Sequence, residues 1–395
     1  MRYRFRCEPT AEQAGYLVHV FGAVRYVYNW GLRLRTDAYF RDGVSINYNQ
    51  SSARLTQLKR TADHAWLNDV SSIPTQQALR HLQTAFANFF ERRSAYPKFK
   101  RKEGTQSAEY TRSAFKYAEG VLTLAGLGRL RVRWSRPFAS QPTTVTLTKD
   151  TAGRYHVTLV LDEPVTRLPA VRQAVGIDLG VTRLATLSTG EVIENPKPLL
   201  AATQRLARAQ RQLARKQRGS HRRLDAKHHV AVLHARLADA RMDWLHKVTT
   251  DLVHQFDTLC IEDLHVRGMT QNHSLARSLS DASLGTFRRL LTEKATRYGR
   301  DLRIVDRFYP SSKRCHVCGH TLDVLPLSVR TWSCPECGTT HDRDANAAQN
   351  ILAAGLAVTA RGGSVRRPTV RPKRRTTPRT VNPSENVIVH DAIRS

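Results

Sequence analysis

Three acidic residues in three unlike contexts constrain the fold of this chain more than any other feature. Asp178 and Glu262 end the short apolar runs Ala-Val-Gly-Ile and Thr-Leu-Cys-Ile, and Asp344 opens an Ala-rich stretch. Such runs predict buried strands whose ends emerge at one crevice. Carboxylates that converge from separate segments repel each other unless cations lie between them. Because two divalent ions about 4 Å apart are standard machinery for cutting phosphodiester bonds, the pattern indicates a metal-dependent nuclease.

Acidic neighbours leave two of these assignments open. Asp263 follows Glu262, and strand alternation puts the two side chains on opposite sides, so only one of them lines the crevice. Asp342 is the alternative to Asp344, which we favour because it lies at the start of the predicted helix. The Gly-x-Asp-x-Gly pattern around Asp178 also occurs in actin-like nucleotide-binding folds. Taken together, the order Asp, strand meander, Glu, helix, strand, Asp predicts an RNase H-like fold.

Four of the six cysteines form two Cys-x-x-Cys pairs separated by fifteen residues: Cys315, Cys318, Cys334 and Cys337. This is zinc-ribbon spacing. Four thiolates complete a tetrahedron and leave no open position, so we expect a structural zinc ion and not a catalytic one. A disulfide framework is the weaker alternative. Neighbouring histidines are alternative ligands, although four sulfurs leave them no role: His316, His320 and His341.

The charge of the chain is strongly basic. Its 63 Lys and Arg against 33 Asp and Glu give a net charge of +30, which predicts a polyanionic partner such as nucleic acid. A membrane surface would also attract this charge, but no apolar stretch is long enough to cross a bilayer. The N-terminus lacks an apolar signal region, so we expect no secretion signal. Cys7 and Cys260 are expected core thiols, and this cysteine usage fits a reducing cytoplasm.

The first half of the chain alternates between strand and helix signals. Thr10 and Gln13 form a capping box that predicts the start of a helix. A second helix is predicted to carry Tyr26 to Leu34. The pattern over residues 10–94 as a whole predicts a small helical bundle. The basic, aromatic-interleaved stretch 96–102 suits contact with a phosphate backbone. With residues 1–8, five further strands would suffice for a small β-barrel: Tyr110–Tyr117, Val121–Leu124, Leu130–Trp134, Thr144–Thr148 and Tyr155–Leu161.

In the second half, three strands predict a meander: Val175–Leu179, Leu184–Ser188 and Glu191–Ile193. A helical region over 199–255 follows, with a break at Gly219-Ser220. Residues 201–250 hold twelve Lys and Arg but three Asp, so we favour contact with a nucleic-acid duplex over a merely solvated helix. Further elements are predicted at Leu259–Ile261 (strand), 284–298 (helix) and Leu302–Phe308 (strand).

Several motifs make the chain resemble the TnpB family, RNA-guided nucleases encoded by insertion sequences, often labelled transposases, and related to type V CRISPR effectors. The resemblance covers about residues 1–355. Its residues are Gly176-Ile-Asp-Leu-Gly180, Ile261-Glu-Asp-Leu264, Pro310–Gly319, Arg330–Gly338 and His341–Asn350, together with Arg25–Trp30, Pro97–Lys102 and Leu275–Ser283.

The resemblance implies an α+β multidomain chain. Residues 1–9 and 103–165 would form a wedge β-barrel, interrupted by a helical recognition domain at 10–102. Residues 172–309 and 341–356 would form an RNase H-like (RuvC) nuclease domain carrying a zinc ribbon at 310–340. The basic tail, 357–395, cannot build a core and is expected to be disordered.

The resemblance also implies an activity. A guide RNA transcribed from the transposon end would direct cutting of double-stranded target DNA beside a short transposon-adjacent motif. The family's metal ligands fall on Asp178, Glu262 and Asp344, which would bind Mg²⁺, expected as two ions. We expect a prokaryotic cytoplasmic protein that works as a monomer with its RNA, without a membrane. The alternatives are a nuclease-inactive RNA-guided repressor and a DNA strand transferase.

Overall fold

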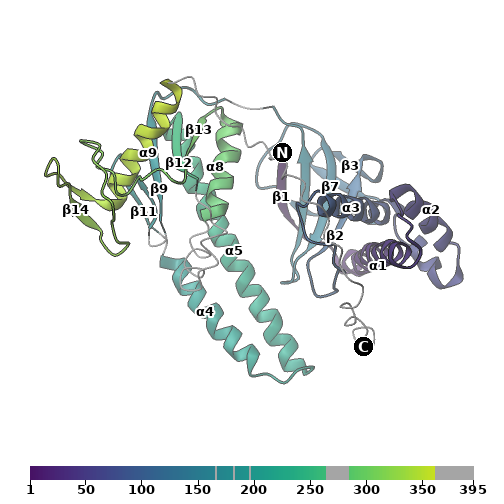
Figure 1. The fold of residues 1–395 in the computed structure, drawn as a ribbon. Helices are drawn as coiled ribbons and strands as arrows, with labels where there is room; N and C mark the ends of the chain where they lie inside the picture. The colour runs from purple at the N-terminus through teal and green to yellow at the C-terminus, as the bar shows by residue number, and fades with distance from the viewer. Residues whose placement is uncertain (165–166, 181–182, 195–196, 264–283, 361–395) are drawn as a thin grey trace.

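The structure, a computed structural model, describes residues 1–164, 167–180, 183–194, 197–263 and 284–360. The familial stretch Leu275–Ser283 and residues 361–395 of the predicted tail lie outside these ranges. Figure 1 shows an N-terminal lobe of helices and sheets and a C-terminal lobe built on a second large sheet. A long helical hairpin extends from the C-terminal lobe. None of the described helices is long and apolar enough to cross a membrane.

The helices of the N-terminal lobe are α1 (Ala11–Asp42), α2 (Tyr48–Leu58), the 3₁₀ helix η1 (Ala62–Asn68) and α3 (Ser72–Phe90). The capping box is confirmed, because Thr10 and Gln13 exchange both side chain to backbone bonds. The prediction of a separate second helix near Tyr26 is wrong. Nothing between Phe21 and Tyr26 caps or breaks the helix, and a single interior glycine, Gly22, costs only about 1 kcal/mol.

The strands of this lobe form two sheets. The first has the order β2-β7-β8-β1-β6, with β1 (Arg2–Cys7), β2 (Gln106–Thr111), β6 (Val132–Arg133), β7 (Pro142–Lys149) and β8 (Tyr155–Leu161). The second has the order β3-β4-β5, with β3 (Phe115–Ala118), β4 (Val121–Leu124) and β5 (Gly128–Leu130). The expected single strand Tyr110–Tyr117 is therefore wrong, because the 3₁₀ turn η2 (Arg112–Ala114) carries the chain from one sheet to the other.

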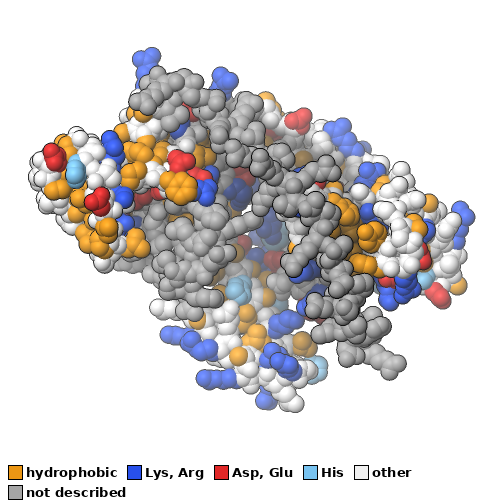
Figure 2. All heavy atoms as spheres, in the orientation of Figure 1, with side chains coloured by type: hydrophobic (Ala, Val, Ile, Leu, Met, Phe, Trp, Pro, Cys, Tyr) orange, Lys and Arg blue, Asp and Glu red, His pale blue; other side chains and the backbone are white. Residues whose placement is uncertain are grey.

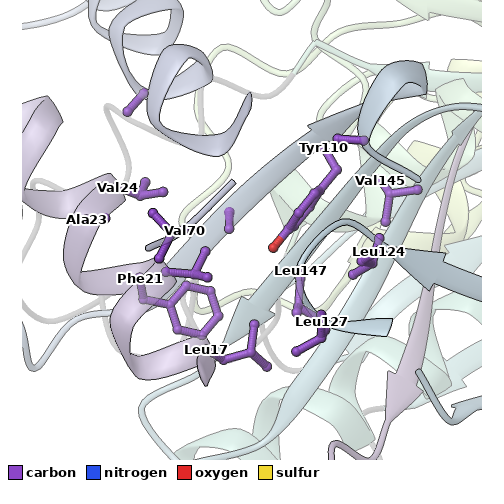
Figure 3. Packing of buried hydrophobic residues seen from close by; sticks show 14 of the residues in the cluster. Leu17, Phe21, Ala23, Val24, Val70, Tyr110, Leu124, Leu127, Val145 and Leu147 are labelled. Atoms are coloured by element: carbon purple, nitrogen blue, oxygen red, sulfur yellow. The ribbon is translucent and has the colours of Figure 1, made fainter. Parts of the chain in front are cut away.

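One hydrophobic core joins the bundle to these sheets. Leu17, Phe21 and Val24 on α1 face Tyr110 and Leu147 of the larger sheet (Figure 3). These side chains are spaced at three and four residues along α1, which is the spacing that puts apolar groups on one helix face. The bundle is thus packed onto the sheet and is not an independent body.

The large sheet of the C-terminal lobe has the order β11-β10-β9-β12-β13. Its strands are β9 (Ala174–Leu179), β10 (Arg183–Leu187), β11 (Val192–Glu194), β12 (Thr258–Glu262) and β13 (Asp301–Val305). β9, β10 and β11 pair antiparallel and form the expected meander, whereas β12 runs parallel to both β9 and β13. A mixed sheet of this kind puts the C-terminal ends of β9, β12 and β13 at one edge.

Helices α4 (Lys197–Ala214), α5 (His221–Gln255), α8 (Leu284–Tyr298) and α9 (Arg343–Ala360) complete the C-terminal lobe. The predicted break at Gly219-Ser220 is confirmed, since the Ser220 side chain caps α5 by accepting a bond from the Arg223 amide. α9 continues to Ala360, four residues beyond the boundary expected for the nuclease domain. The two-stranded sheet β14 (Thr331–Ser333) and β15 (Thr340–Asp342) lies in the cysteine segment just before α9.

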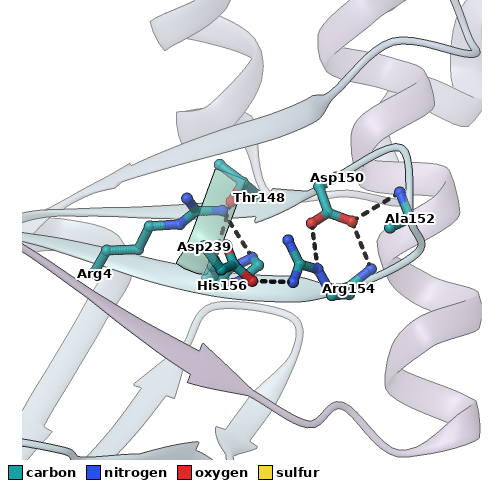
Figure 4. A network of polar contacts seen from close by, with 7 residues as sticks. All are labelled: Arg4, Thr148, Asp150, Ala152, Arg154, His156 and Asp239. Atoms are coloured by element: carbon teal, nitrogen blue, oxygen red, sulfur yellow. Dashed lines mark hydrogen bonds and ion pairs between the residues drawn. The ribbon is translucent and has the colours of Figure 1, made fainter. Parts of the chain in front are cut away.

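Two sets of polar contacts tie the lobes together. The Tyr3 hydroxyl donates to Glu163 (2.6 Å) and accepts from Arg297 of α8 (2.7 Å). In the second set, Arg154 beside β8 binds Asp150 (2.7 Å) and reaches across to Asp239 of α5 (Figure 4). The lobes therefore meet through charged side chains from distant parts of the chain.

Candidate active site and metal centre

Neighbouring strands bring Asp178 and Glu262 together. In the parallel pair of β9 and β12, Ile177 lies opposite Ile261, and the next residues along the two strands are Asp178 and Glu262. Side chains at the same level of a parallel pair point to the same face of a sheet. The two carboxylates are thus adjacent at the C-terminal edge of the large sheet.

Helix α9 brings Asp344 to the same face through a close contact at Gly176. A Cβ atom on Gly176 would collide with the Ala348 carbonyl oxygen and would lie 2.7 Å from the Leu352 amide nitrogen. Asp178 follows Gly176 by two residues, about 6.6 Å along a strand. Asp344 precedes Ala348 by one helical turn, about 5.4 Å. These matching steps place the start of α9 over the end of β9.

The electrostatics of Asp178 reflect this convergence. Burial, then the charge of Asp344 and then that of Glu262 together raise the pKa of Asp178 to about 7, while Arg343 opposes them. The pKa of Glu262 is also raised, first by burial and then by Asp263. Half-buried carboxylates with raised pKa values, such as Asp178 and Glu262, are chemically suited to a divalent cation, which restores the charged form.

The neighbouring acid Asp263 has partners of its own. Its two carboxylate oxygens bind Arg288 of α8 and Arg307, each at 2.6 Å. These bonds, Arg307 first, hold the pKa of Asp263 below its usual range. The carboxylate of Asp263 is therefore neutralised by two guanidinium groups.

Asp342 also has a structural role. Its Oδ1 atom accepts bonds from the amides of Asp344 (3.0 Å) and Ala345 (2.9 Å), so it caps the N-terminus of α9. The carboxylate of Asp344 makes one weaker contact, to Arg330 at 3.5 Å. Of the two acids, Asp342 is committed to the helix end and Asp344 is the freer one.

The four cysteines converge as the spacing predicts. Within the described residues they form the group of potential metal ligands whose donor atoms all lie within 4.8 Å of one another. Each knuckle is closed by a glycine with positive φ: Gly319 (82°) and Gly338 (71°) donate to the Cys315 and Cys334 carbonyls. A set of four thiols has the donor chemistry of a structural zinc site.

Sequence reasoning missed how α9 holds this cysteine segment. Asn346 accepts a bond from the His316 amide (3.0 Å) and donates to the Arg314 carbonyl (2.8 Å). One turn later, Asn350 donates to the carbonyls of Ser311 (2.9 Å) and Arg314 (2.5 Å). Both side chains are buried. The available signal was two asparagines spaced by four residues on one face of an apolar helix.

The histidines divide between two roles. His341 is buried, and its Nε2 atom lies 3.1 Å from the Cys315 sulfur. His316 packs edge-on against His341, with ring centroids 4.9 Å apart and an interplanar angle of 64°. Both line a cavity of about 280 Å³ that also contains Asp342 and Asn346. The two rings thus pack between the cysteine cluster and the first turn of α9.

A basic surface extends from this lobe. The helices α4 and α5 pack on each other through Leu206, Ala209, Val230 and Leu237, and Lys and Arg side chains gather around the far end of the hairpin (Figure 2). With 35 residues, α5 is about 50 Å long. A hairpin of this length and charge offers a broad surface to a polyanion.

Three family models match separate parts of the chain. One described as "Probable transposase" matches residues 155–273, one described as "Cas12f1-like, TNB domain" matches residues 285–351, and one described as "Helix-turn-helix domain" matches residues 1–43. In the structure, residues 1–43 hold one strand and one continuous helix.

Related proteins match almost the whole chain. A "Putative RNA-guided DNA endonuclease" of Streptomyces pristinaespiralis is 52% identical over 92% of this chain and 91% of its own length. The "Putative RNA-guided DNA endonuclease InsQ" of Escherichia coli is 33% identical over 92% and 94%. A "TnpB-like protein" of Acanthamoeba polyphaga mimivirus is 33% identical over 31% of this chain and 24% of its own.

The fold is also similar to that of a solved structure. The protein in a Cas12f1-sgRNA-target DNA complex superposes with a TM-score of 0.56, covering 87% of this chain and 83% of that one, at 14% identity. The likeness concerns the fold alone. On the strength of the relatives that span both chains almost completely, this chain belongs to the TnpB family.

Proposed function

We propose that this chain is an RNA-guided endonuclease that cuts double-stranded DNA beside a transposon-adjacent motif. The observation that carries the proposal is the convergence of Asp178, Glu262 and Asp344 from two parallel strands and a helix start. The names of the full-length relatives point to the same activity. The net charge of +30 fits a protein that holds both RNA and DNA.

Within this proposal, residues 172–309 and 341–356 form an RNase H-like nuclease domain, and residues 310–340 form its zinc ribbon. The mixed sheet with its antiparallel meander and parallel β12 supports this assignment. Residues 1–9 and 103–165 form the wedge domain, and residues 10–102 form the recognition bundle. The sheet order that places β1 between β6 and β8 supports treating the bundle as an insertion.

The carboxylates provide the donors that two Mg²⁺ ions prefer. Asp178 feels the charges of both other acids, so Asp178, Glu262 and Asp344 would hold the ions together, with Asp178 as the ligand nearest to both other carboxylates. Bound there, the ions supply an activated water and stabilise the leaving 3′ oxygen.

The other residues of the site set the geometry. Asp342 fixes the first turn of α9 and so the position of Asp344. Arg330, which contacts Asp344, provides a positive charge at the edge of the site. Base pairing with the guide reads the target sequence, and the protein holds the A-form backbone. The basic α4–α5 hairpin is the proposed contact for that duplex.

Two alternative functions can be distinguished from the proposed endonuclease. A nuclease-inactive repressor would bind guided targets without cutting, which the retained acids oppose. A strand transferase would join DNA ends, and the "Probable transposase" and helix-turn-helix matches are the observations in its favour. We favour the endonuclease and further propose that it acts as a monomer with its RNA in the prokaryotic cytoplasm.

The test uses the protein purified with its associated RNA. Sequencing that RNA gives the guide, and a plasmid carrying the matching sequence beside a randomised flank reports cleavage and the adjacent motif. We expect Mg²⁺-dependent linear product and no joined product. Binding without cutting by the wild type would favour the repressor, and joined ends would favour the strand transferase.

A further inference from the structure

A second cavity lies in the N-terminal lobe, away from the carboxylates. It has a volume of about 200 Å³ and lies where α1 meets the segment leading into β2. Its polar lining comes from two stretches that are far apart in the sequence: Arg25, Lys100, Arg101, Thr105, Gln106 and Ser107. The lining contains cations, hydroxyls and one amide, and no carboxylate.

The wall of this cavity is held in place by two amide side chains. The Asn29 side chain donates to the Lys100 carbonyl (3.0 Å) and accepts from the Lys100 amide (2.8 Å). It thus pairs with both backbone groups of Lys100, as the backbone of a neighbouring β-strand does. Gln106 donates to the carbonyls of Arg101, Lys102 and Gly104 at 2.9 to 3.1 Å. Its oxygen accepts a bond from Arg25 (3.1 Å). The cationic groups are therefore presented by a fixed backbone.

The charges in the cavity are not neutralised. Within the described part of the chain, neither Arg25, Lys100 nor Arg101 pairs with a carboxylate. The Lys100 ammonium lies 4.2 Å from the centre of the Tyr28 ring, and burial lowers the pKa of this lysine. Arg25 and Lys100 are half-buried and Arg101 is exposed, so the cavity presents positive charge that no carboxylate of its lining neutralises, an arrangement that an anionic ligand completes.

We propose that this cavity binds a phosphate group of a nucleic-acid backbone. Lys100 and Arg25 supply the charge, and the hydroxyls of Thr105 and Ser107 supply neutral hydrogen-bond donors. A phosphodiester is favoured over a carboxylate ligand because a strongly basic chain recruits polyanions first. The site lies outside the proposed catalytic centre, and it gives Arg25–Trp30 and Pro97–Lys102 one shared role.

The first experiment measures thermal unfolding of the full chain freed of nucleic acid, with inorganic phosphate as the probe. Lys100→Met keeps the length of the side chain over Tyr28 and removes the charge. The matched control is Lys149→Met, because Lys149 lies 5.3 Å from the Tyr155 ring but lines no cavity described above. Without phosphate, we expect Lys100→Met to melt no lower than the wild type.

With phosphate, the melting temperatures of the wild type and Lys149→Met should rise equally, and that of Lys100→Met by less than half as much. Equal shifts in all three proteins would overturn the proposal. Arg25→Gln is the second variant, which replaces Lys100→Met in the test if Lys100→Met fails to fold. Its melting temperature should also rise with phosphate by less than half as much as that of the wild type.

The second experiment separates the two sources of the phosphate. One arm measures the salt dependence of binding to the co-purifying RNA, and the other that of duplex DNA binding to the RNA-loaded complex. Loss of one phosphate contact lowers the slope by about 0.7 for a single strand or about 0.9 for a duplex. Lys100→Met should lower one slope only, which identifies RNA or DNA as the source.

A phosphate effect on unfolding without a change in either slope would overturn the nucleic-acid assignment. Both arms measure binding and not cutting. The binding measurements can therefore be interpreted even if the chain has no nuclease activity. A failure of the proposed endonuclease function is thus distinguishable from a failure of the proposed phosphate site.

Discussion

At the scale of single residues, the choice between adjacent acids is the main question. Strand alternation predicts that Glu262 and Asp263 diverge, and the structure gives Asp263 two arginine partners. The capping bonds of Asp342 could not be predicted, because His-Asp-Arg-Asp offers two acids that can each begin a helix. Only the observed hydrogen bonds show which acid caps α9.

The acids should therefore respond differently to substitution. We expect Asp178→Asn, Glu262→Gln and Asp344→Asn to abolish guided cleavage while RNA and target binding persist, because these side chains face the proposed metals. Asp342→Asn should retain cleavage, since asparagine caps a helix as well as aspartate does, whereas Asp342→Ala should cost about 1 kcal/mol of stability. Asp263→Asn should cost about 1.5–3 kcal/mol through its weakened arginine pairs and still cut.

Cleavage assays and urea unfolding of each variant check this contrast. If Asp342→Asn silences cutting and Asp344→Asn does not, the third ligand is misassigned. Normal cutting by all five conservative variants, with Mg²⁺ supplied, would place the nuclease site elsewhere.

At the scale of elements, α9 links the parts of the site. It carries Asp344, packs on Gly176 and holds the cysteine segment through Asn346 and Asn350. The sequence predicts the helix from its alanines and apolar periodicity. It does not predict the close approach to β9 or the asparagine bonds, because both depend on the packing of segments at least thirty residues apart.

The contact at Gly176 can be tested by adding one methyl group. Gly176→Ala should destabilise the protein by about 1–3 kcal/mol, as overpacking does, because α9 must move away from β9. Cleavage should fall along with stability, since Asp344 moves with the helix. Gly285→Ala is the control, because no atom lies within 4 Å of its added Cβ; a similar loss in both variants would show that the packing at Gly176 is not the cause.

The asparagine bonds to the cysteine segment make a separate prediction. Asn346→Ala leaves the His316 amide without its acceptor and leaves Asn350 as the remaining donor to the Arg314 carbonyl, which should cost about 1–3 kcal/mol and speed the loss of zinc to a chelator. Ala353→Ser, at an exposed position of α9, is the control. Metal analysis should first give about one zinc ion per chain for the wild type. A zinc-free protein that is fully folded would contradict the ribbon assignment.

At the scale of the whole molecule, a nucleic-acid partner is easier to predict from the sequence than the arrangement of the strands. The net charge of +30 that indicates such a partner follows directly from the composition. The division of the N-terminal strands into two sheets depends on a 3₁₀ turn at Arg112–Ala114, whose residues lack a glycine or proline signal. The contact between lobes through Arg154 and Asp239 joins positions 85 residues apart, beyond any local pattern.

The last prediction concerns the RNA itself. Protein stripped of nucleic acid by nuclease and high salt should lose guided cleavage, because in a guided mechanism base pairing with the RNA reads the target sequence. Adding back the co-purifying RNA should restore cutting, while an RNA of equal length and scrambled sequence should bind without directing it. Binding should weaken about 10³- to 10⁵-fold between 50 and 200 mM salt if six to ten phosphates are contacted. Equal sequence-specific cutting with no RNA present would refute the guided mechanism and leave the carboxylate site as that of an ordinary nuclease.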